Sequence, residues 1–158
     1  MIAEVAGAKC VAVPTALVVA HGTGREGSIA VTLAAKGETT WVQVCRARGT
    51  GESRQVEPVG AARVVRADEL RSACDAAGGA GVLVGDRYLP EPVRSEAARL
   101  GMEVVEPVFD ARACLAIGRT LPAVDPVELL PIYPREPEAV SLWRERRGGS
   151  GVGGGGER

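Results

Sequence analysis

Aromatic residues are scarce in this sequence of 158 residues, where Phe, Trp and Tyr together make up 3%. A folded core must therefore be filled mainly by Val, Leu and Ala, which implies small and tight contacts between helices and strands. Histidine is scarcer still, because His21 is the only one and no second histidine could complete a zinc site with the cysteines. No apolar run approaches the roughly 20 residues that span a bilayer. These absences argue against a zinc-binding module and against a membrane protein.

An excess of either charge is also missing. Nineteen Lys and Arg residues face twenty Asp and Glu residues, which leaves a net charge of −1. Without a broad positive field, the chain is not expected to bind nucleic acid directly. The hydrophobic content of 46% and the charged content of 25% are those of a globular protein, and the length fits one domain.

The cysteines are widely spaced and form no C-x-x-C pair. Each lies in an apolar run, so all of them are predicted to be reduced thiols in the core of a cytoplasmic protein. The first thirteen residues lack the basic start and the long apolar stretch of a signal peptide, which favours the same location. The four cysteines are Cys10, Cys45, Cys74 and Cys114.

The first half of the chain contains the pattern of a hairpin. Residues 9–13 have the composition of a short buried strand, and Thr15 is expected to cap the helix that follows. Residues 28–36 and 39–47 alternate between apolar and polar with a period of two, as the strands of an antiparallel hairpin do. The polar residues 48–61 predict a loop, with a short strand at residues 62–65 after it.

The second half alternates between helices and strands. Three stretches have the spacing of amphipathic helices: residues 68–79, 90–101 and 110–121. Two short apolar stretches between them predict strands: residues 81–86 and 102–107. Asp68 and Asp110 are expected to be N-caps, and Cys114, Ile117 and Leu121 are expected to face the core. This alternation predicts an α/β layer with parallel strand pairing.

Residues 22–27 read GTGREG and match the G-x-G-x-x-G fingerprint of dinucleotide-binding proteins through Gly22, Gly24 and Gly27. The fingerprint binds a pyrophosphate when a strand precedes it and the N-terminus of a helix follows it. Here the following residues have the period of a strand, so a flexible loop is the favoured interpretation. The alternative is a small nucleotide-binding protein that uses this loop.

Three other residues are candidates for chemistry. His21 could act as a general base, but it stands at the expected C-terminus of a helix with no recognisable nucleophile beside it. Asp86 and Asp110 follow predicted strands, where α/β proteins often hold catalytic carboxylates. Structural roles are favoured, because Asp110 has a helix to cap and Asp86 has Arg87 as a salt partner. No catalytic residue, cofactor or metal site is therefore predicted.

The segment DPVELLPIYPREPEAVSLWRER, residues 125–146, places Tyr133 and Trp143 among several prolines. The prolines keep the chain extended up to Pro137, after which a helix can begin. We expect this segment to be a strap that fastens the end of the chain onto the sheet. Residues 148–158 are almost pure glycine and are predicted to be disordered.

This segment resembles the C-terminal signature of the TsaB (YeaZ) family, which takes part in threonylcarbamoyladenosine modification of tRNA. Proteins of that family end in a P-x-Y-x-R element, matched here by Pro131, Tyr133 and Arg135, and Trp143 follows as in some bacterial branches. The order of the upstream elements is also similar. The resemblance covers most of residues 1–147, which are expected to form one TsaB-like C-terminal domain.

The resemblance implies the second half of an actin/Hsp70-like (ASKHA, Gcp-like) fold, with a mixed sheet, an antiparallel hairpin and flanking helices. The first half of that fold, with its D-T-S-like element, has no counterpart, and Ala34 stands where relatives often have an acidic residue. The implied function is that of a non-catalytic scaffold without a cofactor, and the implied partners are a TsaD-like catalytic subunit and a TsaE-like ATPase. A truncated form of such a scaffold is the other expectation. A half-domain is also expected to expose apolar strand edges and a helix face, and to self-associate.

Overall fold

The computed structural model describes residues 7–129, 139–140 and 142–144. Its helices and strands, in chain order, are α2 (Thr15–Gly22), β1 (Gly27–Lys36), β2 (Thr39–Arg48), η1 (Gly51–Ser53), β3 (Gln55–Val65), η2 (Ala67–Glu69), α3 (Leu70–Asp75), β4 (Val82–Val84), α4 (Glu91–Arg99), β5 (Glu103–Val105), α5 (Ala111–Gly118) and η3 (Pro126–Glu128), where η marks a 3₁₀-helix. None of the described helices is long and apolar enough to cross a membrane.

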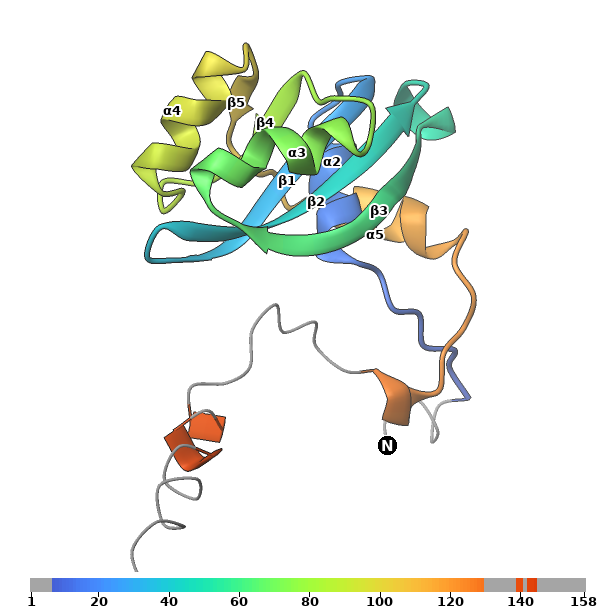
Figure 1. Cartoon of the computed structure of the whole chain (residues 1–158). Helices are drawn as coiled ribbons and strands as arrows, with labels where there is room; N and C mark the ends of the chain where they lie inside the picture. The colour runs from blue at the N-terminus through green and yellow to red at the C-terminus, as the bar shows by residue number, and fades with distance from the viewer. Residues whose placement is uncertain (1–6, 130–138, 141, 145–158) are drawn as a thin grey trace, which may run out of the picture.

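The strands form one mixed sheet in the order β3-β2-β1-β4-β5 (Figure 1). β1 and β2 form an antiparallel hairpin, and β3 pairs antiparallel with β2. β4 pairs parallel with β1, and β5 pairs parallel with β4. The structure therefore confirms the predicted hairpin and the predicted parallel layer.

Helices cover both faces of this sheet. α2 and α5 pack on one face in a cluster that includes Ile29 and Val31 of β1. α3 and α4 pack on the other face in a second cluster, to which β1 contributes Ala30. These three residues of β1 are all fully buried, because the central strand has a helix layer on either side.

β3 is much longer than the sequence predicted. Residues 55–65 form one strand, where we expected a loop up to residue 61 and a strand only from residue 62. Pro58 and Gly60 produced that wrong prediction, since both residues usually interrupt strands. Pro58 is tolerated because β3 lies at the edge of the sheet, and Gly60 lies at a bulge where the register with β2 shifts between Val42 and Val44.

Two expectations near the start of the described chain were wrong. Residues 9–13 form no strand, and only Cys10 makes an isolated antiparallel bridge, with Val124. Thr15 is not the cap of α2, because Pro14 takes the N-cap position and its side chain cannot accept a hydrogen bond.

Later in the chain, two more expectations were wrong and one was confirmed. Asp68 caps no helix: the turn at η2 is closed by Glu69, whose Oε2 accepts the Arg66 N–H at 2.8 Å. Asp110 is the N-cap of α5, where its Oδ1 accepts the Arg112 N–H at 2.8 Å, as predicted. Cys114 is exposed, because α5 turns Ala113 and Ile117 toward the core instead.

Candidate functional site

The GTGREG loop joins the end of a helix to the start of a strand. Gly22 is the last residue of α2, and Gly27 is the first residue of β1. A phosphate-binding loop has the opposite order, with a helix N-terminus after it. Two backbone N–H groups of the loop already have nearby acceptors: Gly24 donates to the His21 carbonyl at 3.3 Å, and Arg25 donates to Thr23 Oγ1 at 3.2 Å.

Backbone geometry accounts for the three glycines of this loop. Gly24 has a φ of 67° and Gly27 a φ of 94°, values that residues with a Cβ atom rarely adopt. Gly22 packs against the segment before α5, where an added Cβ would lie 2.9 Å from the Val108 carbonyl oxygen. Turn geometry and close packing thus require glycine at these positions, and nucleotide binding by the loop stays the alternative hypothesis.

A buried arginine that the sequence analysis did not single out holds this loop in place. Arg54 is only 8% exposed. Its guanidinium donates to the carbonyls of Gly49 at 3.2 Å and Ala20 at 3.3 Å, and also to the carbonyl of Arg25. The three acceptors belong to the turn after β2, the end of α2 and the GTGREG loop. No sequence signal marked Arg54, because a basic residue in a polar stretch is usually exposed.

The Arg54 guanidinium is imperfectly satisfied. Its Nε is buried and has no hydrogen-bond partner among the described residues. Burial lowers the pKa of Arg54, and the charge of Glu26 partly opposes this effect. A buried cation held by carbonyl dipoles without a carboxylate partner is a costly arrangement.

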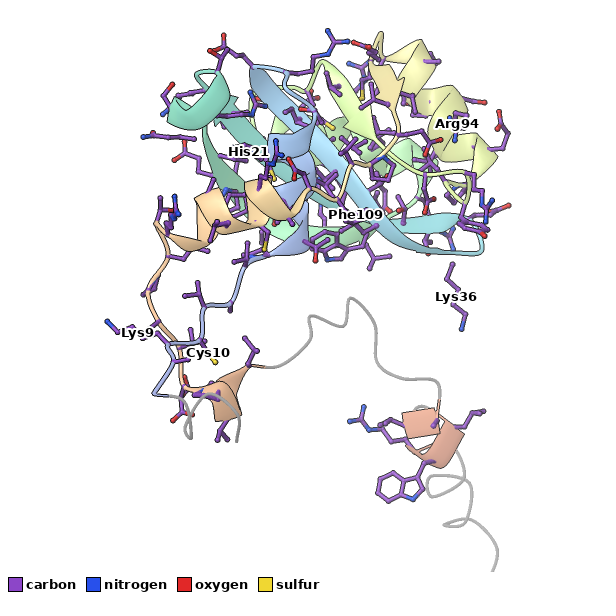
Figure 2. The ribbon with its side chains drawn as sticks, turned by 180° about the vertical axis from the view of Figure 1, so that it is seen from behind. Lys9, Cys10, His21, Lys36, Arg94 and Phe109 are labelled. Carbon is purple, nitrogen blue, oxygen red and sulfur yellow. The ribbon has the colours of Figure 1, made fainter. Side chains whose placement is uncertain are left out.

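His21 lies in the last turn of α2, as predicted, where the helix meets the segment before α5 (Figure 2). Burial is the main cause that lowers its pKa below the ordinary value of 6.5. The positive charge of Arg54 lowers it further, and the negative charge of Asp110 opposes both. The surroundings of His21 thus favour its neutral form. Among the described residues, no serine or cysteine forms a hydrogen bond with its side chain, so the structural interpretation is favoured.

The two aspartates that follow parallel strands both accept hydrogen bonds from nearby backbone N–H groups. Asp86 Oδ1 accepts the Tyr88 N–H at 2.8 Å, and Asp110 caps α5. The predicted salt bridge between Arg87 and Asp86 does not form. The Arg87 guanidinium instead donates to the Tyr88 hydroxyl at 2.7 Å and lies over the Tyr88 ring, with Cζ 4.8 Å from the ring centroid. Each carboxylate thus has a local hydrogen bond that accounts for its position.

A pocket of about 250 Å³ lies between the second half of α5 and the paired ends of β2 and β3. Its lining residues are Arg46, Arg48, Arg54, Gln55, Val56, Glu57, Ala116, Ile117 and Thr120. The one carboxylate, Glu57, lies 3.6 Å from the Arg48 guanidinium in an exposed ion pair. The Thr120 hydroxyl donates to the Ile117 carbonyl at 2.8 Å. The lining has no base next to a nucleophile, so it offers no catalytic pair.

The thiols differ in their surroundings. Cys45 and Cys74 are buried as predicted, whereas Cys10 is half-buried and Cys114 is exposed. Burial raises the pKa of Cys45 to about 12 and also raises the pKa of Cys74. Within the described ranges, no three His, Cys, Asp or Glu side chains come together as a metal site would require.

The residues that carry the family resemblance lie mostly outside the described part of the chain. Pro131, Tyr133 and Arg135 are not described, nor are residues 148–158, which were predicted to be disordered. Trp143 is described, within the helical residues 142–144, and is 52% exposed. The proposed strap and the roles of these four residues therefore stay predictions.

This chain is similar to a known protein in its fold, whereas comparisons of its sequence find no match. No protein-family model matches the sequence, and no curated protein matches it. A solved structure does match: an uncharacterized protein from Pseudomonas aeruginosa with similarity to the peptidase YEAZ, at a TM-score of 0.56 and 15% identity. The chain has a YeaZ-like fold. The match covers 85% of this chain and 62% of that one, so the chain spans less than two thirds of its structural neighbour.

Proposed function

We propose that this YeaZ-like chain is a non-catalytic scaffold in the modification of tRNA to threonylcarbamoyladenosine. In this role it contacts a TsaD-like catalytic subunit and a TsaE-like ATPase. The single observation that carries the proposal is the YeaZ-like fold, which extends over 85% of the chain. The proposal includes the finer assignment of the fold as the second half of an actin/Hsp70-like structure, with which the mixed sheet order β3-β2-β1-β4-β5 is compatible.

The local chemistry supports a scaffold. Asp86 and Asp110 accept hydrogen bonds from nearby backbone N–H groups, and His21 lies in the last turn of α2. The GTGREG loop is followed by β1 and not by a helix. The Arg54 guanidinium donates hydrogen bonds to three backbone carbonyls. These features leave a folded surface as the means of action, which is what an assembly subunit needs.

The test is an assembly and activity experiment with the full chain. A tagged chain is mixed with purified TsaD-like and TsaE-like proteins of the same organism, and complexes are separated by size-exclusion chromatography. The mixture is then supplied with tRNA and the modification precursors, and threonylcarbamoyladenosine is measured by mass spectrometry of nucleosides. We expect co-elution and a product yield that depends on the chain.

Two variants sharpen this test. Tyr133→Ala changes the family motif and is expected to lower the product yield, whereas Arg71→Ala changes an exposed arginine on α3 and is expected to leave it unchanged. Absence of both co-elution and product would contradict the proposal. Titration with ATP and NAD separates the alternative function, since saturable binding by the chain alone would favour a nucleotide-binding protein.

A further inference from the structure

α5 lies beside β3 (Figure 1), and the pocket between them has the buried Arg54 in its wall. The Nη1 and Nη2 atoms of Arg54 donate to three backbone carbonyls. Its Nε–H is a buried donor for which the described residues offer no acceptor. A buried donor without an acceptor is costly, and more so on a charged group. A molecule in the pocket that accepts from Nε would remove this cost.

The positive charge of Arg54 also lacks a partner. Within the described ranges, none of the ion pairs includes this residue. Burial lowers the pKa of Arg54 more than the charge of the exposed Glu26 raises it. Breaking up a buried ion pair leaves a charge that is strongly destabilising, and Arg54 stands in that situation without a bound anion. The partner that its surroundings favour is therefore an anion.

The other charged residues of the pocket are better satisfied. Arg48 lies 3.6 Å from Glu57 in an ion pair. The Arg46 guanidinium donates to the Ala77 carbonyl at 3.0 Å, beyond the end of α3. The lining contains three arginines and one glutamate, so its formal charge is +2. The pocket therefore attracts anions, and Arg54 is the cation in it that is both buried and left with an unpaired donor.

One wall of the pocket is apolar. Ile117 is buried, and Val56 and Ala116 are half-buried. The pocket volume of about 250 Å³ is that of about eight water molecules at about 30 Å³ each. A ligand that matches this pocket is therefore small and has an apolar part next to an anionic end.

We propose that this pocket binds a short aliphatic carboxylate. The carboxylate accepts the Nε–H of Arg54 and neutralises its charge, and the hydrocarbon chain packs against Val56, Ala116 and Ile117. A carboxylate fits better than inorganic phosphate, because its single charge matches one unpaired guanidinium and its chain buries the apolar wall. This binding site goes beyond the proposed scaffold function and does not depend on it.

Titration of the ¹⁵N-labelled full chain with hexanoate tests the proposal by nuclear magnetic resonance. The side-chain Nε–H signal of Arg54, assigned by its loss in Arg54→Met, is expected to move downfield and to saturate. Acetate lacks most of the hydrocarbon chain and is expected to bind about tenfold more weakly. Hexanamide lacks the charge and inorganic phosphate lacks the chain, and both are expected to bind at least about tenfold more weakly. Absence of a saturable shift with hexanoate, or equal binding of any of the other three, would overturn the proposal.

Two substitutions on α5 separate the pocket from the fold. Ala116→Phe fills the apolar wall and keeps Arg54, so it is expected to weaken hexanoate binding at least about tenfold. Ala111→Phe adds the same side chain at an exposed position outside the pocket and is the matched control, with unchanged affinity. Arg54→Met is expected to abolish binding, and circular dichroism checks that it is folded. Hexanoate binding that survives Ala116→Phe contradicts the proposal, whether or not Arg54→Met folds.

Discussion

Replacing Arg54 by methionine tests whether this residue fixes the loops around the end of α2. Its guanidinium donates to three backbone carbonyls, those of Ala20, Arg25 and Gly49. A hydrogen bond from a charged donor contributes about 1.5–3 kcal/mol, so the gross contribution is about 5–9 kcal/mol. Burying a cation without a carboxylate partner costs several kcal/mol, which offsets most of that sum. We expect Arg54→Met to lower the free energy of unfolding by about 1–3 kcal/mol.

Thermal unfolding followed by circular dichroism measures this change. For a domain of this size, about 2–4 °C of melting temperature corresponds to each kcal/mol, so the midpoint is expected to fall by about 2–12 °C. Arg63→Met is the control, because Arg63 is exposed on β3 and its change is expected to stay within about 0.5 kcal/mol. Hydrogen exchange is expected to accelerate at residues 20–27 and 49–51. An unchanged midpoint in Arg54→Met would show that the buried guanidinium gives no net stability.

Three further predictions follow from burial. The pKa of His21 is lowered on folding, so the unfolded chain takes up a proton first as the pH falls below about 6.5, and the free energy of unfolding decreases there; urea titrations should show a smaller decrease in His21→Gln. Leu83→Ala empties a fully buried site in β4 and is expected to cost about 2–5 kcal/mol, measured by urea unfolding against the exposed Leu115→Ala. At pH 8, Cys114 is expected to react with a thiol reagent much faster than Cys45, whose pKa is raised to about 12, and equal rates in the folded chain would contradict the burial of Cys45.

The hairpin could be predicted from the sequence because its strands carry local signals. β1 and β2 have β-branched residues in alternation and a glycine, Gly37, with a φ of 60° in the turn between them. β3 carries no such signal. Its side chains are mostly exposed, and Pro58 and Gly60 are typical of loops. It is a strand because β2 supplies its hydrogen-bond partners. The periodicity of a sequence does not show which strand it will pair with.

The candidate site shows the same difference between local signals, which a sequence carries, and contacts between distant segments. Asp110 was correctly expected to cap α5, since an N-cap depends on residues only two or three positions away. Arg54 could not be found in this way, because its acceptors Ala20 and Arg25 lie about thirty residues earlier in the chain. Cys114 was assigned to the core from its apolar neighbours, yet the phase of α5 is set by packing against α2 and the sheet. Local chemistry was readable from the sequence, and contacts between distant segments were not.

The location of uncovered apolar surface bears on how this chain meets a partner. The sequence analysis expected it at the strand edges and on a helix face. The long edge strand β3 carries Pro58 and a bulge, both of which weaken pairing with another strand. The other edge, β5, is only three residues long. The large exposed apolar side chains include Leu115 on α5, Phe109 just before it and Val127 in η3. Contacts through exposed side chains are therefore a more favourable route to association than extension of the sheet.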